Sequence, residues 1–412
     1  MQYSIIVIGD ELLIGQVTDT NSGWIARHLS PLGWEAKSIK VIADNGDDIA
    51  QAIDEAFAAT DVVLMTGGLG PTKDDITKAT LCQYFGGEMV FNEDVKRNVD
   101  AMFAKRGLPM NQLTAAQAMV PSSCRVIQNE VGTAPIMWFE RNGKVLVSMP
   151  GVPIETQTMM ERSVINALIK HFHSDVTIEH RTFVVVDYAE SALAEKLADF
   201  EQQLPDYIHL AYLPSQGIIK LRLTGSHPDA QVINADMERL AKQLHKIIGK
   251  SIIADSDLPL AQIVGERLRE LNLTLSTAES CTGGNVAHVI TEIAGSSDYF
   301  MGSVVSYSND VKHRVLGVDQ STLDTFGAVS QPVVEQMAHG VSQLCRTHCA
   351  VATSGVAGPS GGTPDKPVGT VWMAAKVGDI VMSQCRHLPG GRKQIIDRAT
   401  NQVLIMLLKM LS

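Results

Sequence analysis

Apolar runs of strand length alternate with helical patterns along the first 169 residues of the chain. Residues 4–8, 35–42 and 61–65 are predicted as strands. Between them, residues 20–32 and 49–59 place apolar side chains at the three- and four-residue spacing of an amphipathic helix. Strands that alternate with helices in this way predict a parallel sheet with helices on both of its faces.

The pattern changes in the middle of the chain. Between residues 170 and 252 the strands and helices are segregated, which predicts a small α+β module. The predicted elements are strands at 182–187, 208–212 and 218–224 and helices at 191–203 and 230–248. Residues 252–260 contain two aspartates and a proline and are predicted as a linker.

Alternation of strands and helices resumes after about residue 260 and continues toward the last residue. The predicted strands are 274–278, 304–307, 350–354 and 368–374, and the predicted helices include 261–271, 331–345 and 394–411. We therefore expect an α/β fold in three parts: a doubly wound N-terminal domain at 1–169, an α+β module at 170–252 and an α/β C-terminal domain at 258–412.

Composition and charge narrow the classes of function. The 412 residues are 45% hydrophobic and 19% charged, which is typical of globular domains. The formal net charge of −11 argues against a protein that binds nucleic acid or an anionic membrane surface. The sequence has no apolar run of about 18 residues that would span a membrane. The six cysteines form no C-x-x-C pair, so we expect free thiols in a reducing cytoplasm.

The sharpest motif of the N-terminal part is the glycine-rich segment 66–77, TGGLGPTKDDIT, between a predicted strand and a helical pattern. Glycines allow the backbone to approach an anion closely, and the N-terminus of the following helix directs N–H groups at it. Asp74 and Asp75 are suited to bind a metal ion or a ribose. The alternative is a tight turn in which an aspartate caps the helix.

Three further polar segments follow predicted strands or lie near sheet edges, at 9–21, 129–135 and 150–153. In open α/β sheets, ligands bind beyond the carboxyl ends of the strands. We therefore expect these segments to converge with the glycine-rich segment 66–77 on one ligand site.

Residues 277–284, TAESCTGG, follow a predicted strand and open a helix in the C-terminal part. The hydroxyl of Ser280 would lie near helix-terminal N–H groups that stabilise an oxyanion. Serine needs a base, and Lys312 can act as one if burial lowers its pKa. Cys281 is a competing nucleophile, because thiols are intrinsically better nucleophiles. The plainer alternatives are a helix-capping serine and a solvated surface lysine.

A second glycine-rich loop, 354–362, follows the predicted strand at 350–354 and holds four glycines. Its backbone amides are suited to surround a phosphate, to which Arg392 and Arg398 would add positive charge. The alternative is a flexible surface loop without a ligand. A basic pocket of this size is compatible with an acidic chain.

The four N-terminal motifs at 9–21, 66–77, 129–135 and 149–155 together resemble the N-terminal domain of the CinA family, which is related in fold to molybdopterin-binding domains. The resemblance implies a doubly wound domain that hydrolyses ADP-ribose to AMP and ribose 5-phosphate with a divalent metal and potassium. It implies metal ligands at Glu11, Asp19, Asp74 and Asp75. It implies phosphate or nucleotide contacts at Gly67, Gly68, Gly70, Thr72, Gly132 and Thr133.

The middle module resembles the KH-like insert between the two catalytic domains of full-length CinA proteins. A KH domain that binds RNA needs a G-x-x-G loop with basic neighbours. Residues 170–250 contain no such loop. We therefore expect no nucleic-acid partner, and a module that sets the arrangement of the domains or contributes to dimer contacts.

Residues 258–412 are similar to the nicotinamide-mononucleotide amidohydrolase family, which forms the C-terminal domain of CinA. The motifs that carry the similarity are AESCTGG, GSSDYFMGSVVSYSNDVKHRVLGV, GAVSQPVVEQMA, SGVAGPSGG and KPVGTVW. The similarity implies that Ser280 is the nucleophile and that Lys312 and Tyr307 lie beside it. We expect substrate contacts at Thr282, Gly283, Gly284, Asn309, Gly355, Gly358, Gly361, Gly362, Arg392 and Arg398.

Together the resemblances imply a bifunctional hydrolase of pyridine-nucleotide salvage. In the C-terminal domain, neutral Lys312 would take the proton of Ser280, directly or through Tyr307, during deamidation of nicotinamide mononucleotide. N–H groups near Thr282 and Gly283 would hold the oxyanion, and no metal is expected there. The alternative is a regulatory protein that binds a nucleotide or pterin without N-terminal turnover. The expected partners are small nucleotides and a second copy of the chain in a homodimer, with no membrane.

Overall fold

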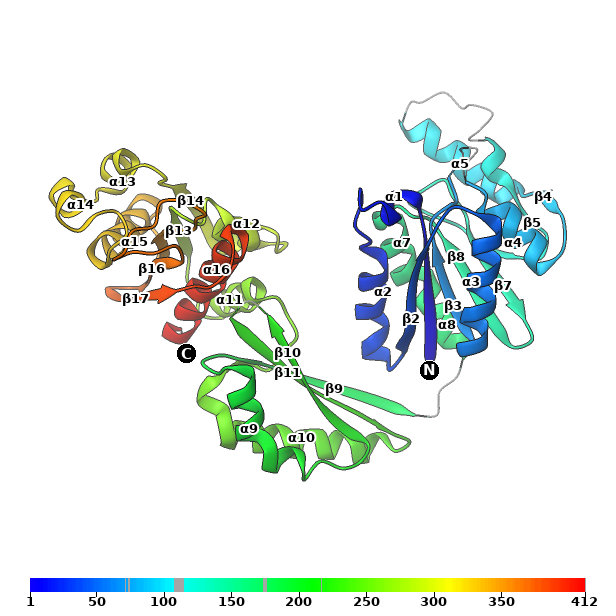
Figure 1. The fold of residues 1–412 in the computed structure, drawn as a ribbon, viewed down its shortest axis with the longest axis horizontal. Helices are drawn as coiled ribbons and strands as arrows, with labels where there is room; N and C mark the ends of the chain where they lie inside the picture. The colour runs from blue at the N-terminus through cyan, green and yellow to red at the C-terminus, as the bar shows by residue number, and fades with distance from the viewer. Residues whose placement is uncertain (71, 73–74, 107–114, 173–175, 216, 412) are drawn as a thin grey trace. The chain divides into compact units, whose positions relative to one another are not determined.

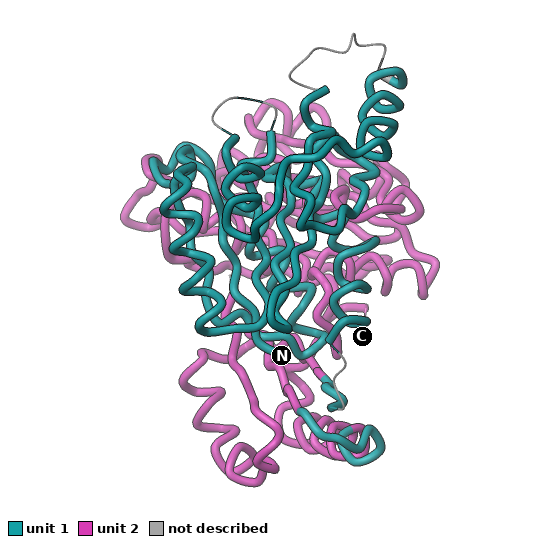
Figure 2. Tube along the Cα trace, turned by 90° about the vertical axis from the view of Figure 1, so that its right-hand side faces the viewer, with its two compact units in different colours: residues 1–179, 226–233 teal, residues 180–225, 234–412 magenta. Residues whose placement is uncertain are grey.

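The computed structural model describes residues 1–70, 72, 75–106, 115–172, 176–215 and 217–411. The chain forms two compact units, which Figure 2 colours separately. Unit 1 comprises residues 1–179 and 226–233, and unit 2 comprises residues 180–225 and 234–412. Helices and strands are mixed in both units, as the sequence predicts. No helix in the described part of the chain is long and apolar enough to cross a lipid bilayer.

Unit 1 is built on a six-stranded sheet in the order β2-β1-β3-β8-β7-β6 (Figure 1). Its first four strands run parallel, which confirms the parallel sheet expected from the sequence. β7 and β6 extend the sheet as an antiparallel edge that the sequence analysis did not predict. The strands are β1 Gln2–Ile8, β2 Glu35–Ile42, β3 Val62–Thr66, β6 Arg125–Ile127, β7 Ile136–Arg141 and β8 Lys144–Met149.

Helices cover both faces of this sheet, because successive side chains of a strand point to opposite faces. In β1, Ile5 enters one core with Ile25 of α2, and Ile6 enters the other core with Ile49 of α3. The first core also receives α7, a π-helical turn and α8, and the second receives α4. The bounds are α2 Asn21–Leu29, α3 Gly46–Ala59, α4 Thr77–Phe85, α7 Pro153–Met159, the π-helix Met160–Val164 and α8 Ile165–His171.

Short elements account for most of the differences from prediction in unit 1. The helix predicted at 20–32 ends as an α-helix at Leu29 and continues as a 3-10 turn over Ser30–Leu32, because Pro31 has no N–H to continue the ladder. The elements that the sequence analysis did not identify include α7, the π-helix and α8, and also α1 Asp10–Leu13, α5 Glu93–Arg106, the 3-10 turn Ala116–Ala118 and the antiparallel pair of β4 Met89–Phe91 with β5 Met119–Pro121.

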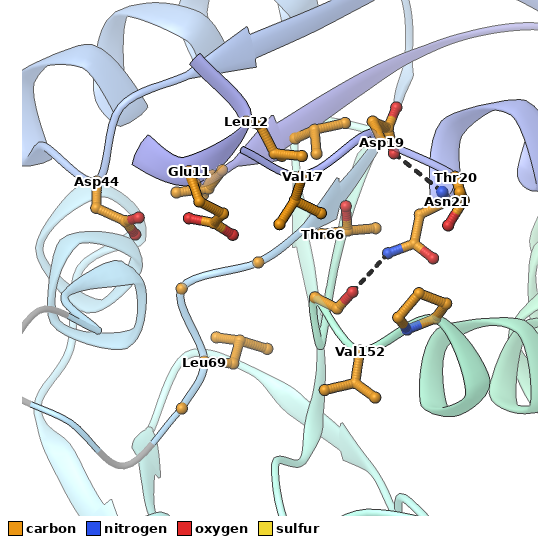
Figure 3. Close-up of a pocket in the computed structure, with 18 of the residues that line it drawn as sticks. Glu11, Leu12, Val17, Asp19, Thr20, Asn21, Asp44, Thr66, Leu69 and Val152 are labelled. Atoms are coloured by element: carbon orange, nitrogen blue, oxygen red, sulfur yellow. Dashed lines mark hydrogen bonds between the residues drawn. The ribbon is translucent and has the colours of Figure 1, made fainter. Parts of the chain in front are cut away.

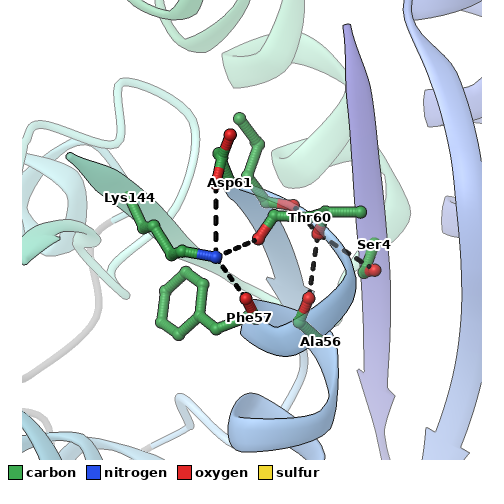
Figure 4. A network of polar contacts seen from close by, with 7 residues as sticks. Ser4, Ala56, Phe57, Thr60, Asp61 and Lys144 are labelled. Atoms are coloured by element: carbon green, nitrogen blue, oxygen red, sulfur yellow. Dashed lines mark hydrogen bonds and ion pairs between the residues drawn. The ribbon is translucent and has the colours of Figure 1, made fainter. Parts of the chain in front are cut away.

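A polar network fixes the end of α3 against strands of the sheet (Figure 4). The hydroxyl of Thr60, the residue after α3, donates to Ala56 O at 3.1 Å and to Ser4 Oγ of β1 at 3.2 Å. Lys144 at the start of β8 donates to the carbonyls of Phe57 and Thr60. The last carbonyls of a helix have no partner inside the helix, so the lysine satisfies them and ties α3 to β8.

The middle module has a four-stranded sheet in the order β10-β11-β9-β12 together with two helices (Figure 1). Its elements are β9 Thr177–Val185, α9 Glu190–Glu201, β10 Ile208–Ser215, β11 Ile218–His227, α10 Ala230–Ile248, the 3-10 turn Gly249–Ser251 and β12 Ile252–Ala254. These elements confirm the predicted α+β module. The linker predicted at 252–260 is wrong in its first residues, because β12 pairs antiparallel with β9.

The C-terminal sheet has five strands in the order β14-β13-β15-β16-β17. β13 runs parallel to β14 and β15, and β16 and β17 complete the sheet antiparallel. The strands are β13 Leu275–Glu279, β14 Phe300–Val305, β15 Cys349–Gly355, β16 Thr370–Val377 and β17 Ile380–His387. Because β13 and β14 are parallel neighbours, the segments that follow them lie at the same edge of the sheet.

Helices also cover both faces of the C-terminal sheet. Ala278 and Ala352 pack with α15 on one face, and Leu275 and Val351 pack with α11, α12 and α16 on the other. The bounds are α11 Leu260–Glu270, α12 Asn285–Thr291, the 3-10 turn Ser296–Asp298, α13 Asn309–Leu316, α14 Gln320–Phe326, α15 Gln331–Cys345 and α16 Arg392–Met410.

The core on the α16 face extends into the middle module. Val184, Val186 and Ile218 of the middle module belong to the same cluster of buried side chains as α11 and α16. An ion pair joins Lys409 of α16 to Asp187 at 2.6 Å. Residues 180–225 and 234–254 of the middle module therefore share a hydrophobic core with the C-terminal domain in unit 2.

Candidate functional sites

The turn between β13 and α12 is held by a buried carboxylate. Glu279, the last residue of β13, is fully buried and accepts four hydrogen bonds from the segment that follows it. The donors are Thr282 Oγ1 at 2.7 Å and the backbone N–H groups of Gly284 at 3.0 Å, Val286 at 3.0 Å and Ala287 at 2.8 Å. These bonds cap α12 and fix the turn that presents Ser280. The sequence analysis missed this role, although Glu279 stands inside the AESCTGG motif.

Ser280 and Lys312 meet as the sequence analysis expected. Lys312, in the first turn of α13, donates from Nζ to Ser280 Oγ at 3.0 Å. Its other acceptors are the carbonyls of Ser306 at 2.7 Å and Tyr307 at 3.4 Å. The lysine is 1% exposed, and burial lowers its pKa to about 8. A substantial neutral fraction near physiological pH is what a general base for serine requires.

The buried surroundings of Cys281 disfavour it as the nucleophile. Its side chain is buried, and this burial raises the pKa of the thiol to about 12. The reactive form of cysteine is the thiolate, which is scarce at neutral pH when the pKa is this high. The alternative that the sequence left open is therefore disfavoured, and Ser280 is the better placed nucleophile.

Tyr307 lies beside the pair but contacts it differently from the expectation. Its side chain is 62% exposed, and its hydroxyl accepts a hydrogen bond from Arg392 Nη2 at 3.0 Å. Only its backbone carbonyl reaches Lys312. Of the two proton routes considered from sequence, the direct contact of Lys312 with Ser280 is the one that the structure contains.

A cavity of about 280 Å³ opens over Ser280. Ser280, Cys281, Tyr307 and Lys312 line it together with residues of the glycine-rich loop after β15. Five of the predicted substrate contacts line this cavity: Asn309, Gly355, Gly358, Gly361 and Arg392. Ser354 and Ser360 also line it, and the sequence analysis did not single them out.

Other predicted contacts lie elsewhere. Thr282, Gly283 and Gly284 line a second cavity of about 590 Å³, which Arg392 also borders. Gly362 is not a lining residue of either cavity; a side chain there would meet the Val368 backbone at 2.9 Å, so the glycine serves close packing. Arg398 does not line them either, because its guanidinium donates to the carbonyl of Pro389.

The predicted oxyanion donors need a correction of one residue. The N–H of Gly283 donates to Ser280 O at 3.1 Å, and the N–H of Gly284 is taken by Glu279. The backbone N–H groups of Cys281 and Thr282 have no backbone acceptor among the residues that the structure describes. Two such amides directly after the proposed nucleophile are suited to hold an oxyanion.

The N-terminal cavity, of about 470 Å³, lies at the carboxyl ends of β1 and β3 (Figure 3). Among the predicted residues, Glu11, Asp19, Gly67, Gly68, Gly70 and Asp75 line it. Thr72, Gly132 and Thr133 do not. Asp44 also lines it and was missed, although it follows β2 closely, where a ligand-binding residue is expected. Burial and the nearby carboxylates of Asp10 and Glu11 raise the pKa of Asp44.

The amides of the first glycine-rich loop are engaged within the protein. The N–H groups of Gly70 and Thr72 donate to the carboxylate of Asp75 at 2.7 and 2.9 Å. The N–H of Gly67 donates to Met149 O at 3.1 Å. An internal carboxylate therefore occupies two of the donors that the sequence analysis assigned to a phosphate, those of Gly70 and Thr72, as in the alternative of a turn held by an aspartate.

The four-acid metal site expected from the resemblance is not assembled among the described residues. They include no group of three or more His, Cys, Asp or Glu side chains that could hold a metal ion. Asp19 accepts from the N–H groups of Asn21 and Ser22 at 2.9 and 3.1 Å and so caps α2. Asp75 serves the glycine-rich loop, and Asp74 lies outside the described residues.

Three family models match the chain in succession. They are described as a probable molybdopterin binding domain over residues 4–170, a damage-inducible protein CinA KH domain over 180–254 and a CinA C-terminal domain over 257–411. This order agrees with the predicted layout of a molybdopterin-binding-like domain, a KH-like module and a C-terminal α/β domain.

Similar proteins cover the chain almost completely. A CinA-like protein of Flavobacterium psychrophilum is 42% identical over 99% of this chain and 98% of its own length. One of Cytophaga hutchinsonii is 44% identical over 90% of this chain and 88% of its own. The solved structure of competence/damage inducible protein CihA from Agrobacterium tumefaciens is 42% identical and covers 38% of this chain and 99% of that one, with a TM-score of 0.37. At this identity over nearly its whole length, the chain belongs to the CinA family.

Proposed function

We propose that the C-terminal domain deamidates nicotinamide mononucleotide to nicotinic acid mononucleotide and ammonia. The observation that carries the proposal is the 3.0 Å contact between Lys312 Nζ and Ser280 Oγ. A buried lysine with a lowered pKa supplies the base that a serine nucleophile needs. The cavity over the serine provides room for the reacting carboxamide.

The reaction would proceed through an acyl-enzyme. Neutral Lys312 takes the proton of Ser280 while Oγ forms a bond to the carboxamide carbon. The N–H groups of Cys281 and Thr282 are suited to stabilise the oxyanion that results. The carbon–nitrogen bond then breaks as protonated Lys312 gives its proton to the departing amine, which leaves as ammonia. Water hydrolyses the ester to the acid and restores Ser280.

Ammonia release from nicotinamide mononucleotide tests this function in three variants. Ser280→Ala should abolish turnover, and Lys312→Met should reduce kcat by about 10²- to 10⁴-fold, because it removes the general base. Lys376→Met is the control, since Lys376 is another buried lysine but donates to Ser342 Oγ at 3.2 Å, away from the cavity. Normal turnover by Ser280→Ala would contradict the proposal.

For the N-terminal cavity we propose binding of a nucleotide- or pterin-like ligand without turnover. The specific observation is that Asp75 occupies the loop amides of Gly70 and Thr72, while no group of three or more metal-binding side chains is assembled among the described residues. The resemblance also implies ADP-ribose hydrolysis, and an assay with divalent metal and potassium decides between the two. Formation of AMP and ribose 5-phosphate would favour hydrolysis, and retained ligand without products would favour binding.

We place these activities in a reducing compartment, the cytoplasm. All six cysteines are free thiols, and three of them are buried. Free thiols persist where glutathione and thioredoxin keep cysteine reduced. Fractionation of cells with an antibody against the chain tests this assignment.

A further inference from the structure

We propose that Tyr307 binds the positively charged pyridinium ring of the substrate through the face of its own ring, and that Arg392 holds the tyrosine in this position. The inference rests on the deamidation proposed above and names what selects its substrate. It replaces a role in proton transfer, which the resemblance left open for Tyr307, with a role in specificity.

The hydrogen bonds around Tyr307 separate its hydroxyl from the proton route. Lys312 Nζ lies 3.0 Å from Ser280 Oγ, so the proton can pass between them without a third group. The Tyr307 hydroxyl instead accepts a hydrogen bond from Arg392 Nη2 at 3.0 Å. Only the backbone carbonyl of Tyr307 contacts the base. A hydroxyl that is bound to a guanidinium and absent from the serine–lysine contact is not required as a relay.

The cavity lining contains one group that can attract a positively charged ring. In nicotinamide mononucleotide the ring nitrogen carries a positive charge. None of the described residues that line the cavity is an aspartate or a glutamate, and its two basic residues are Lys312 and Arg392. Tyr307 is the one aromatic residue among them. The negative face of an aromatic ring attracts a cation, so Tyr307 is the group in this lining that is suited to compensate the pyridinium charge.

Arg392 restrains a tyrosine that would otherwise be free to turn at the surface. The arginine, at the start of α16, donates from Nη1 to Gly358 O at 2.8 Å and from Nη2 to the Tyr307 hydroxyl. It thus joins the glycine-rich loop to the segment before α13. Because the side chain of Tyr307 is 62% exposed, this bond limits the positions of a ring that has few packing contacts. Arg392 is a positioning residue in this scheme.

Two small compounds, tested as competitive inhibitors, separate recognition of the positive charge from the deamidation step. The cation 1-methylnicotinamide and uncharged benzamide have similar rings and carboxamides. We expect the wild-type chain to prefer the cation by roughly 2- to 30-fold. Tyr307→Phe keeps the ring but loses the hydroxyl that Arg392 holds, so it should weaken the preference without abolishing it, with kcat within about threefold of wild type. Tyr307→Leu should lose the preference and raise KM for nicotinamide mononucleotide about tenfold with little change in kcat.

Variants of α16 test the positioning role. Arg392→Met should weaken the preference for the cation, although it removes a positive charge from the cavity, because Tyr307 loses its restraint. Lys409→Met is the matched control on the same helix, since Lys409 pairs with Asp187 and does not line the cavity. It should leave the preference and both kinetic constants unchanged.

The outcomes that overturn the inference are distinct from those that overturn deamidation. A loss of about 10²-fold or more in kcat for Tyr307→Phe would make the hydroxyl a proton relay. An unchanged preference in Tyr307→Leu, or a wild type that binds the two compounds equally or binds neither, would also overturn the inference. If the wild type releases no ammonia, deamidation fails, and binding of the two compounds by calorimetry still decides the role of Tyr307.

Discussion

Lys312 owes its chemistry to the absence of solvent around it. The described residues that line the cavity over Ser280 include no histidine or aspartate, and the proposed base is a lysine whose ammonium form is penalised by burial. The pairing of Ser280 and Lys312 is predicted from the resemblance to the amidohydrolase family, and the structure explains it, because their segments follow parallel neighbouring strands. The sequence could not predict the direction in which Tyr307 points or the engagement of the Gly283 amide. Both depend on single hydrogen bonds, to Arg392 and to Ser280 O.

The pH dependence of turnover should report the state of Lys312. The base must be neutral, and its pKa is about 8, so it is mostly protonated and inactive at lower pH. We expect kcat/KM for nicotinamide mononucleotide to rise about tenfold per pH unit below pH 8 and to level off above it. A rate that is constant from pH 6 to pH 9 would show that Lys312 does not act as this base.

Cys281 should be dispensable for the reaction. Its thiol is buried with a pKa raised to about 12, so it contributes no nucleophile at neutral pH. Cys281→Ala keeps the backbone N–H proposed for the oxyanion and should retain kcat within about tenfold of wild type. Ammonia release measures this directly. A loss as large as that of Ser280→Ala would instead identify the thiol as the reacting group.

At the scale of elements, long periodic segments were predictable and short ones were not. The helices α10 and α15 and the strand β2 have the bounds that the sequence predicts, because their patterns extend over many residues. The three-residue strands β6 and β12 carry too few residues for a pattern, and tertiary pairing alone defines them. The same limit applies to Glu279, whose function as a cap depends on the turn that it stabilises.

Replacing Glu279 should weaken both the fold and the site. In Glu279→Gln, one acceptor oxygen becomes an amide N–H₂ group that faces the N–H groups of α12. We expect the free energy of unfolding to fall by about 2 kcal/mol and kcat to fall with it, because the turn that carries Ser280 is loosened. Urea denaturation and ammonia release measure the two effects.

Glu292→Gln is the matched control for this change. Glu292 follows α12, is exposed and forms an i,i+4 pair with His288 at 3.4 Å. Its loss should change the unfolding free energy by less than about 0.5 kcal/mol. If Glu279→Gln were no more destabilising than this control, the cap would not be important for the turn.

At the scale of the whole molecule, three sequence domains are arranged as two compact units. The sequence predicts the change of pattern between the middle module and the C-terminal domain, but not their common core. That core depends on Val184, Val186 and Ile218, which read from sequence as ordinary interior residues of the middle module. The burial of these side chains against α11 and α16 joins the two parts energetically.

A cavity in the core shared by the middle module and the C-terminal domain should destabilise both parts. Val184→Ala removes two methyl groups from a fully buried side chain and should cost about 2 kcal/mol. Compounds that bind in the cavity over Ser280 should stabilise one unfolding transition in calorimetry of the full chain. We expect Val184→Ala to lower the temperature of that transition. Val232→Ala is the control, because Val232 of α10 is exposed. If Val184→Ala lowered only the temperature of a separate unfolding transition that these compounds do not affect, the middle module and the C-terminal domain would not unfold together.

The 19-residue helix α16 reaches from the cavity over Ser280 to the middle module. At 1.5 Å per residue it is a rod of about 28 Å. Arg392 at its first position lines the cavity over Ser280, and Lys409 near its last position pairs with Asp187 of the middle module. A single helix therefore contributes both to the lining of this cavity and to the contact with the middle module, so a change that displaces α16 would alter both.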